Sequence, residues 1–278
     1  GVRGHGRGRM IGTDGANGIK VGSAAGEKTH GAPATTADGA AYIRLEEVDS
    51  TNVYIRSLPG RNAVVTARRQ TGGKGTKGRS FVSDEGGVYL TRRTFPENFP
   101  AEDAFLVMAN ASVAVCRTLE RSGLAPGIKW PNDIYVSGRK ICGILIENTF
   151  SGRFLSRSIV GIGLNVNNDL PFELRDIAIS MKEAAGHPFC REEVEETLAE
   201  ETGKRFPMEE YLSRLIGMGE EAVVVCGDER IPVRLLSVDE RGGLLAKTPS
   251  GERRFSAAEV SLRPAAKGNF AVDKGKNG

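Results

Sequence analysis

Glycines and cations alternate in one stretch of this 278-residue chain in a way that suits phosphate binding. Residues 68–81 read Arg-Arg-Gln-Thr-Gly-Gly-Lys-Gly-Thr-Lys-Gly-Arg-Ser-Phe. Glycine lets backbone N–H groups approach a ligand closely, and the cations add charge that a neutral amide cradle lacks. The stretch departs from the Walker and dinucleotide-binding patterns, because Gly78 is not followed by a Lys-Ser/Thr pair that opens a helix. On these residues alone, a phosphate-binding loop and a solvated basic loop fit equally well.

A cluster of small polar residues, Asp49-Ser50-Thr51-Asn52, precedes a helical pattern that continues to Leu58. Such residues often cap helices, and the local sequence favours that interpretation. The cluster also combines hydroxyl and amide side chains with the free N–H groups of a helix start, which suits a small neutral ligand that forms hydrogen bonds. Both interpretations stay open on the sequence alone.

A third group of polar residues lies in a hairpin that we predict over residues 127–147. Pro131 interrupts its first arm, so we expect a bulge or bend that turns Asn132 and Asp133 away from regular pairing. If the arms pair, Lys140 can converge with these two side chains, a composition that suits a phosphate and its Mg²⁺. A lysine at the tip of a hairpin is more often simply solvated.

Composition excludes several classes of site. Only one of the three histidines, His187, lies in the body of the chain, which argues against histidine-based catalysis and multi-histidine metal centres. The cysteines form no C-x-x-C pair, so we expect neither a zinc site nor disulfides, and a reduced cytoplasmic location. We expect no membrane span or secretion signal. The net charge of +3 is too small to indicate nucleic acid as the main partner.

Apolar patterns predict an α+β framework that positions these groups. The predicted elements are strands near 42–48, 62–67, 87–91 and 159–166, and helices near 53–58, 101–122, 174–185 and 191–217. Five short strands separated by turns follow from residue 219 and predict a small β-barrel. We therefore expect disordered ends at 1–40 and 265–278, a main domain at 41–217 and a barrel at 218–264.

The order of these pieces resembles the biotin protein ligases. The resemblance rests on residues 49–52, the glycine–cation loop at 70–79, Lys129-Trp130-Pro131-Asn132-Asp133, Arg139-Lys140 before an apolar strand, and Gly161-Ile162-Gly163-Leu164-Asn165. The barrel, which ends in Glu259-Val260-Ser261-Leu262-Arg263, looks like that family's C-terminal domain. Over residues 42–264 the resemblance implies a mixed sheet packed by helices, as in class II synthetases, followed by an SH3-like β-barrel.

The resemblance also implies roles for individual residues. Biotin would be held by Ser50, Thr51, Asn52, Gln70, Lys74, Gly75, Thr76 and Lys140. The nucleotide would be held by Lys74, Lys77, Gly78, Arg79, Asn132, Lys140 and Asn165. Lys140 would contact both the biotin carboxylate and the α-phosphate, with Asp133 as the second catalytic residue. Asn132, Asp133 and Asn165 match the family's polar residues on the nucleotide and metal side, no residue is assigned as a metal ligand, and ATP and Mg²⁺ would be required.

The implied activity is that of a biotin–[acetyl-CoA-carboxylase] ligase, which forms biotinyl-5'-AMP and transfers biotin to a lysine of a biotin carboxyl carrier protein. We expect no DNA binding, because residues 1–40 lack the apolar periodicity of a helix-turn-helix domain. A homodimer through the edge of the central sheet is compatible with the resemblance. Two alternatives are a lipoate–protein ligase and a non-catalytic nucleic-acid-binding protein; residues 129–133 and the barrel favour biotin over lipoate.

Two residues depart from the family pattern. Lys74 and Thr76 stand where the family loop usually has arginine, and neither can make the bidentate contacts that arginine makes with phosphate. We therefore expect the adenylate to be held more loosely and released faster.

Overall fold

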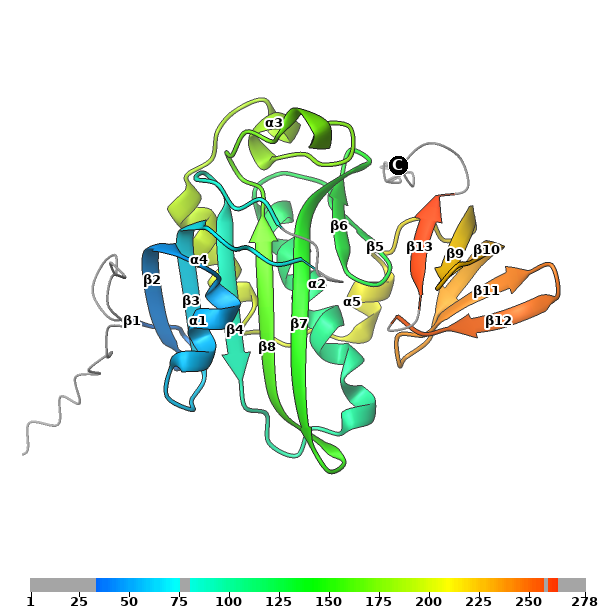
Figure 1. Cartoon of the computed structure of the whole chain (residues 1–278), viewed down its shortest axis with the longest axis horizontal. Helices are drawn as coiled ribbons and strands as arrows, with labels where there is room; N and C mark the ends of the chain where they lie inside the picture. The colour runs from blue at the N-terminus through cyan, green and yellow to red at the C-terminus, as the bar shows by residue number, and fades with distance from the viewer. Residues whose placement is uncertain (1–33, 76–80, 258–259, 265–278) are drawn as a thin grey trace, which may run out of the picture.

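The computed structural model describes residues 34–75, 81–257 and 260–264. Eight strands of this part of the chain form one sheet, in the order β1-β2-β3-β4-β8-β7-β6-β5 (Figure 1). The strands are β1 (Ala34–Thr35), β2 (Ala41–Val48), β3 (Ala63–Gln70), β4 (Val88–Thr94), β5 (Gly127–Lys129), β6 (Asp133–Val136), β7 (Arg139–Ser151) and β8 (Phe154–Leu164). The helices are α1 (Thr51–Ser57), η2 (Ala101–Asp103), α2 (Phe105–Arg121), η3 (Phe172–Leu174), α3 (Met181–Ala185), α4 (Arg191–Glu201) and α5 (Met208–Leu212).

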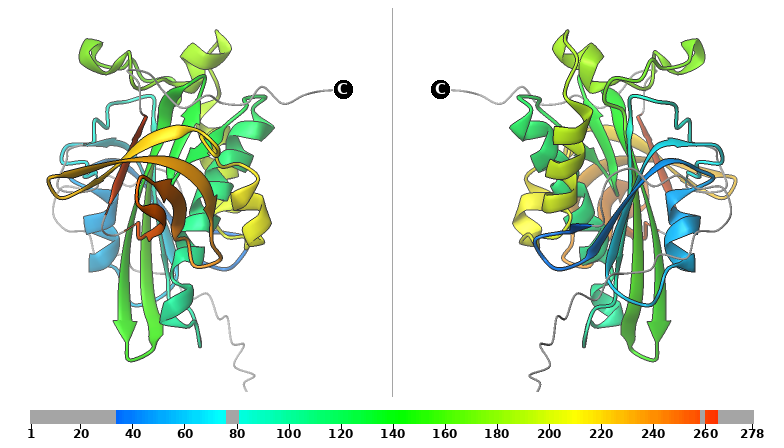
Figure 2. Two further views of the ribbon diagram at one scale, coloured as in Figure 1. Left: turned by 90° about the vertical axis from the view of Figure 1, so that its right-hand side faces the viewer. Right: turned by 90° about the vertical axis from the view of Figure 1, so that its left-hand side faces the viewer.

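Helices cover both faces of this sheet. Helices α2, α4 and α5 lie on one face, and α1 lies on the other (Figure 2). The larger core fills the first face and includes Leu119, Trp130 and Leu198, whereas a smaller core packs Leu45 and Ile55 beneath α1. Burial on both faces explains why the predicted strands at 62–67 and 159–166 read as apolar runs, whereas residues 42–48, near the edge of the sheet, alternate apolar and polar residues. The predicted α+β class is confirmed.

The first β-α-β unit brings distant polar residues together. Strands β2 and β3 are parallel, and Val48 lies opposite Gln70 in the ladder. Because α1 starts directly after β2, Gln70 at the end of β3 lies beside the start of α1. The glycine–cation loop then connects β3 to β4, which is antiparallel to it, so the prediction that this loop joins two strands is confirmed.

The predicted hairpin at 127–147 is more complex than expected. Strands β5 and β6 pair with each other, with Lys129 opposite Asp133, so the Trp130–Asn132 segment is a turn and Asp133 stays in the ladder. The expectation that Asp133 leaves regular pairing is therefore wrong. The irregularity lies one strand further along, where Ile134 pairs with Cys142 but Tyr135 pairs with Lys140. Such a register shift bends a strand and re-aims its side chains.

The predicted helices at 174–185 and 191–217 are wrong in extent. The first region contains only η3 and the short α3, which ends at Gly186 with φ of +79°. The second contains α4 and α5, and Pro207 directly precedes α5. Proline disfavours helical backbone in the residue before it and is tolerated at a helix start, which explains the break. No helix in the described ranges is long and apolar enough to cross a membrane.

A second, antiparallel sheet follows in the order β12-β11-β10-β9-β13. It contains β9 (Glu221–Cys226), β10 (Glu229–Val238), β11 (Leu244–Thr248), β12 (Gly251–Phe255) and β13 (Ser261–Pro264), which confirms the predicted short strands. It lies beyond β5 and α5 at one end of the main sheet (Figure 1). The Trp130 indole N–H donates to the Gly242 carbonyl at 3.0 Å, and so joins the second sheet to the turn between β5 and β6.

Candidate active site

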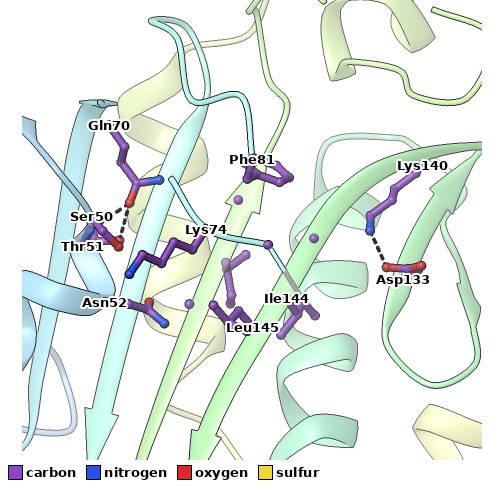
Figure 3. Close-up of a pocket in the computed structure, with 15 residues that line it drawn as sticks. Ser50, Thr51, Asn52, Gln70, Lys74, Phe81, Asp133, Lys140, Ile144 and Leu145 are labelled. Carbon is purple, nitrogen blue, oxygen red and sulfur yellow. Dashed lines mark hydrogen bonds and ion pairs between the residues drawn. The ribbon is translucent and has the colours of Figure 1, made fainter. Parts of the chain in front are cut away.

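A pocket lies on the α1 face of the main sheet and collects most of the predicted site residues (Figure 3). Its walls come from the start of α1, the end of β3, the glycine–cation loop and strands β6, β7 and β8. It is lined by Ser50, Thr51, Asn52, Gln70, Lys74, Gly75, Phe81, Asp133, Lys140, Gly143, Ile144, Leu145, Gly161, Ile162 and Gly163. Segments far apart in the sequence therefore meet at one site.

Glycines form the floor of the pocket because larger residues would not fit there. A Cβ atom at Gly161 would lie 2.2 Å from Asn52 Oδ1, and one at Gly163 would lie 2.5 Å from the Phe81 ring. Gly143 on the neighbouring strand also faces Phe81, at 3.1 Å. The glycines of β8 therefore allow close approach, and the groups that approach are two side chains of the pocket, Asn52 and Phe81.

Hydrogen-bonding groups occupy the α1 end of the pocket. Ser50 is at the N-cap position but its side chain makes no capping bond, so the capping interpretation is wrong for this residue. Gln70 Oε1 accepts from the Thr51 backbone N–H at 2.9 Å and from its hydroxyl at 3.0 Å, while Gln70 Nε2 donates to Ser83 Oγ at 2.9 Å. Gln70 is thus held rigidly, and the Ser50 hydroxyl has no partner among the described residues.

Asn52 is fixed at both ends of its amide. The Thr91 hydroxyl donates to Asn52 Oδ1 at 2.6 Å, and Asn52 Nδ2 donates to the Glu147 carboxylate at 3.0 Å. Asn52 is buried, whereas Glu147 is partly exposed and also pairs with Arg56. Asn52 therefore lines the pocket with an amide whose orientation is already set.

The opposite end of the pocket carries the charged pair. Lys140 Nζ lies 2.5 Å from Asp133 Oδ1, and each side chain is 35% exposed (Figure 3). The Lys140 backbone is held on both sides, since its N–H donates to the Ile177 carbonyl and its carbonyl accepts from the Ile179 N–H, each at 2.9 Å. The predicted convergence is confirmed for Lys140 and Asp133, whereas the Asn132 amide is bonded to the Ile144 carbonyl and does not line the pocket.

Lys74 and Gly75 line the pocket between these two ends. The Lys74 side chain extends over the pocket toward the α1 end (Figure 3). Its ammonium makes no ion pair with any described residue. Thr76, Lys77, Gly78 and Arg79, which we predicted to contact biotin or nucleotide, lie outside the described residues.

Two predicted nucleotide residues do not line the pocket. Asn132 Nδ2 donates to the Ile144 carbonyl at 3.0 Å. Asn165 is buried, donates to the Ile179 carbonyl at 3.3 Å and accepts from Asn168 Nδ2 at 3.1 Å. Both amides hold the backbone of segments that border the pocket, Ile144 in its lining and Ile179 next to Lys140.

Sequence reasoning missed the apolar part of the pocket. Phe81 lies over the glycine floor, and its backbone N–H closes the loop by donating to the Gly73 carbonyl at 2.9 Å. The sequence could have indicated Phe81, because it is the first apolar residue after the cations of the loop. Ile144, Leu145 and Ile162 gave no signal beyond strand character, because facing the pocket depends on strand register.

Tyr135 pairs with Lys140 in the ladder between β6 and β7, but it belongs to the large core and does not line the pocket. Burial raises the pKa of Tyr135 to about 12, with a further contribution from the charge of Asp133, so Tyr135 is neutral near pH 7. The described residues contain no group of three His, Cys, Asp or Glu side chains suited to a metal ion. The pocket suits an elongated ligand with a neutral polar head, an apolar middle and an anionic tail.

Comparisons with known proteins agree with this geometry. The model of the Biotin/lipoate A/B protein ligase family matches residues 46–165. The bifunctional ligase/repressor BirA of Bacillus subtilis is 31% identical over 81% of this chain and 74% of its own length. A biotin–[acetyl-CoA-carboxylase] ligase of Paracoccus denitrificans is 29% identical over 78% of this chain and 98% of its own. The Aquifex aeolicus biotin protein ligase, solved with biotin and ATP, is 31% identical, with a TM-score of 0.71 over 81% of this chain and 99% of that one.

Proposed function

The chain belongs to the biotin protein ligase family, and we propose from this that it activates biotin with ATP and transfers it to a carrier protein. The observation that carries the proposal is the pocket itself. Fixed polar groups at the α1 end face the Lys140–Asp133 pair across a floor of glycines. Biotin has the matching parts, with a ureido head, an aliphatic chain and a carboxylate.

The α1 end would hold the head of biotin. The Ser50 hydroxyl, without a partner among the described residues, is available to the ureido group. Thr51 is bonded to Gln70, and Asn52 is bonded to Thr91 and Glu147, so little ordering is needed when biotin binds. Phe81 and Leu145 would pack against the apolar part of the ligand.

In the first step a biotin carboxylate oxygen attacks the α-phosphate of ATP and pyrophosphate leaves. Two anions must meet, so cations lower the barrier by offsetting the charge that develops on the phosphate. We propose that Lys140 contacts both the carboxylate and the α-phosphate; it lines the pocket, and Lys74 extends over the same pocket. Alignment of the two reactants lowers the activation barrier by roughly 7–11 kcal/mol in favourable cases. No protein nucleophile is required.

Asp133 is the residue that fits Mg²⁺. Mg²⁺ is commonly held by one or two carboxylates together with substrate phosphates, and Asp133 is the carboxylate that lines the pocket. Bound there, Mg²⁺ would offset negative charge on the nucleotide phosphates. We propose from the resemblance that Lys77, Gly78 and Arg79 contribute further phosphate contacts and that Thr76 contacts the biotin carboxylate. Asn132 and Asn165 would serve the nucleotide side by fixing the backbone next to Ile144 and Lys140.

In the second step the amine of a carrier lysine attacks the acyl carbon of biotinyl-5'-AMP, and AMP leaves. The amine loses a proton as the amide forms, and we propose that Asp133, which lines the pocket beside Lys140, or a group of the substrate accepts it. We also propose that residues 41–217 form the catalytic domain and residues 218–264 the second domain. The partner is a biotin carboxyl carrier protein, the expected location is the cytoplasm, and a homodimer through the edge of the main sheet is compatible with the fold.

Incubation with ATP, Mg²⁺, biotin and a carrier domain, followed by mass spectrometry, tests the proposal. We expect one biotinyl group on the carrier and a biotin-dependent exchange of pyrophosphate into ATP. Exchange driven by lipoate in place of biotin would instead identify a lipoate–protein ligase. Salt-sensitive binding of RNA or DNA without any adenylate would support the non-catalytic alternative.

A further inference from the structure

Glu147 lies outside the lining of the pocket but connects its two halves. The residue is on β7, the strand that begins with Arg139 and Lys140, while both of its partners, Asn52 and Arg56, are on α1. Helix α1 packs over β3, β4 and β8, so the Glu147 carboxylate reaches it from the next strand of the sheet. It therefore joins the element that carries the polar end of the pocket to the element that carries the charged end.

The hydrogen bonds of Asn52 fix which way its amide faces. A carboxylate only accepts hydrogen bonds, so Asn52 Nδ2 must face Glu147, and Oδ1 then receives the Thr91 hydroxyl. Gly161 leaves the space that Oδ1 needs. With Glu147 removed, Nδ2 loses its acceptor and the amide is free to rotate away from Thr91.

We propose that Glu147 is a positioning residue for biotin, which it affects through Asn52 without touching the ligand. This inference rests on the proposed function, because it concerns how the α1 end holds the biotin head. The carboxylate keeps the Asn52 amide in one orientation and keeps the start of α1 at a fixed distance from β7. Ser50 and Thr51, at the start of the same helix, depend on the same connection.

The competing explanation is that Glu147 matters only through its ion pair with Arg56. These side chains are 37% and 45% exposed, respectively, and exposed pairs of this kind contribute little. The two explanations predict different behaviour for two variants. Glu147→Gln removes the charge but keeps an oxygen that accepts from Asn52 Nδ2, whereas Arg56→Ala removes the ion pair and leaves the bond to Asn52.

Calorimetric titration of the full chain with biotin distinguishes the positioning role of Glu147 from a role through the ion pair with Arg56. We expect Glu147→Ala to weaken biotin binding roughly tenfold, the usual effect of losing a hydrogen bond to a charged group. Glu147→Gln should restore affinity to within about twofold of wild type, and Arg56→Ala should stay within the same range. In biotin-dependent pyrophosphate exchange, Glu147→Ala should raise KM for biotin and leave kcat and KM for ATP nearly unchanged.

Two controls make the test specific. Glu47→Ala removes a carboxylate from another surface pair of the same sheet, with Arg69, and should leave biotin binding unchanged. Asn52→Ala combined with Glu147→Ala should weaken binding no more than Asn52→Ala alone, because the two residues act as one unit. Melting temperatures of all variants show whether the fold is kept.

The experiments distinguish failure of this inference from failure of the proposed function. A wild type that binds biotin beside a Glu147→Ala variant that binds it equally well overturns this inference and leaves the proposed function standing. A Glu147→Gln variant as weak as Glu147→Ala also overturns it, because the charge would then matter and not the bond to Asn52. A wild type that neither binds biotin nor exchanges pyrophosphate overturns both proposals.

Discussion

Lys140 has a backbone that is held by hydrogen bonds on both sides and a side chain whose ammonium can exchange its partner for a ligand. Its backbone N–H and carbonyl are both held by the segment Ile177–Ile179, so the start of the side chain is placed accurately. Its ammonium, by contrast, pairs only with Asp133 among the described residues, and the pair is partly exposed. Exchange of this partner for an incoming carboxylate or phosphate costs little, which is what a catalytic cation needs.

Lys140→Ala should therefore abolish most activity without unfolding the protein. We expect adenylate formation to fall roughly 10²–10³-fold, as when one preorganised electrostatic contact to a transition state is lost. Pyrophosphate exchange measures this rate, and the melting temperature should change by no more than a few degrees. Lys182→Ala is the matched control, because Lys182 makes a similar pair with Asp169 outside the pocket. Near-normal exchange by Lys140→Ala would refute the assignment.

Gly161 is the second residue for which the geometry makes a sharp prediction. An alanine Cβ would lie 2.2 Å from Asn52 Oδ1, so the Asn52 side chain must move. By analogy with overpacked cores, we expect biotin affinity to fall roughly tenfold or more. Gly60→Ala is the control, because a Cβ added there would meet no described residue within 4 Å apart from its chain neighbours. Titration with biotin would contradict the prediction if both variants bound equally well.

At the scale of elements, α1 is held from its other end by a buried arginine. Arg93 on β4 is 2% exposed, and its guanidinium donates to the carbonyls of Ile55 at 2.6 Å, Leu58 at 3.1 Å and Arg61 at 2.7 Å. It also donates to the Pro59 carbonyl. These carbonyls lie at the end of α1 and in the turn after it, where helix carbonyls lack partners of their own. Arg93 thus anchors the helix whose first turn lines the pocket.

Arg93→Leu should loosen α1 and destabilise the fold by about 2–4 kcal/mol, since several charge-assisted hydrogen bonds are lost together. Urea unfolding measures the loss, and amide exchange should show that α1 loses the most protection. Arg93→Lys, which keeps the charge but fewer donors, should give an intermediate value. Equal stability of the wild type and Arg93→Leu would show that water replaces these bonds without cost.

These elements also show what the sequence could and could not predict. Strand and helix positions followed from local apolar patterns, and the glycine–cation stretch was correctly placed between two strands, although β3 extends to Gln70 and so includes its first three residues. The end of β4 was not predicted, because two adjacent arginines normally mark the end of a buried strand. In the structure Arg92 and Arg93 lie within β4, and both are less than 5% exposed. The bond between Asn52 and Glu147 joins residues 95 positions apart and depends on strand order, which no local pattern contains.

The site residues were predictable to different degrees for the same reason. Lys140 and Asp133 lie seven positions apart on neighbouring strands, so their convergence followed once the strands paired. Asn165 was assigned by resemblance alone and Asn132 also from its position in the predicted hairpin, but both amides hold backbone carbonyls. Their distance from the pocket lining follows from the turn between β5 and β6 and from the path of the chain after β8, both of which are tertiary features.

At the scale of the whole molecule, the second sheet contacts the turn that precedes Asp133. Trp130 is 1% exposed and donates to the Gly242 carbonyl, while the Tyr211 hydroxyl donates to the Pro131 carbonyl at 2.7 Å. Asp133 begins β6 directly after this turn. The second sheet and α5 therefore hold both sides of the segment on which the position of Asp133 depends, so a shift of that sheet should reach the active site.

Gly242→Ala tests this connection, because Gly242 has φ of +78° and an added Cβ would lie 2.1 Å from the Phe105 ring. Trp130 is the only tryptophan of the chain, so its fluorescence reports directly on the contact. We expect a red shift of the emission as the indole becomes hydrated, together with slower pyrophosphate exchange as Asp133 moves away from Lys140.

Gly227→Ala is the control, since Gly227 also has a positive φ, of +58°, but open space around it among the described residues. It should cost stability through its backbone conformation alone and leave both the emission and the exchange rate unchanged. If Gly242→Ala shifts the emission while exchange continues at the wild-type rate, the second sheet does not position Asp133.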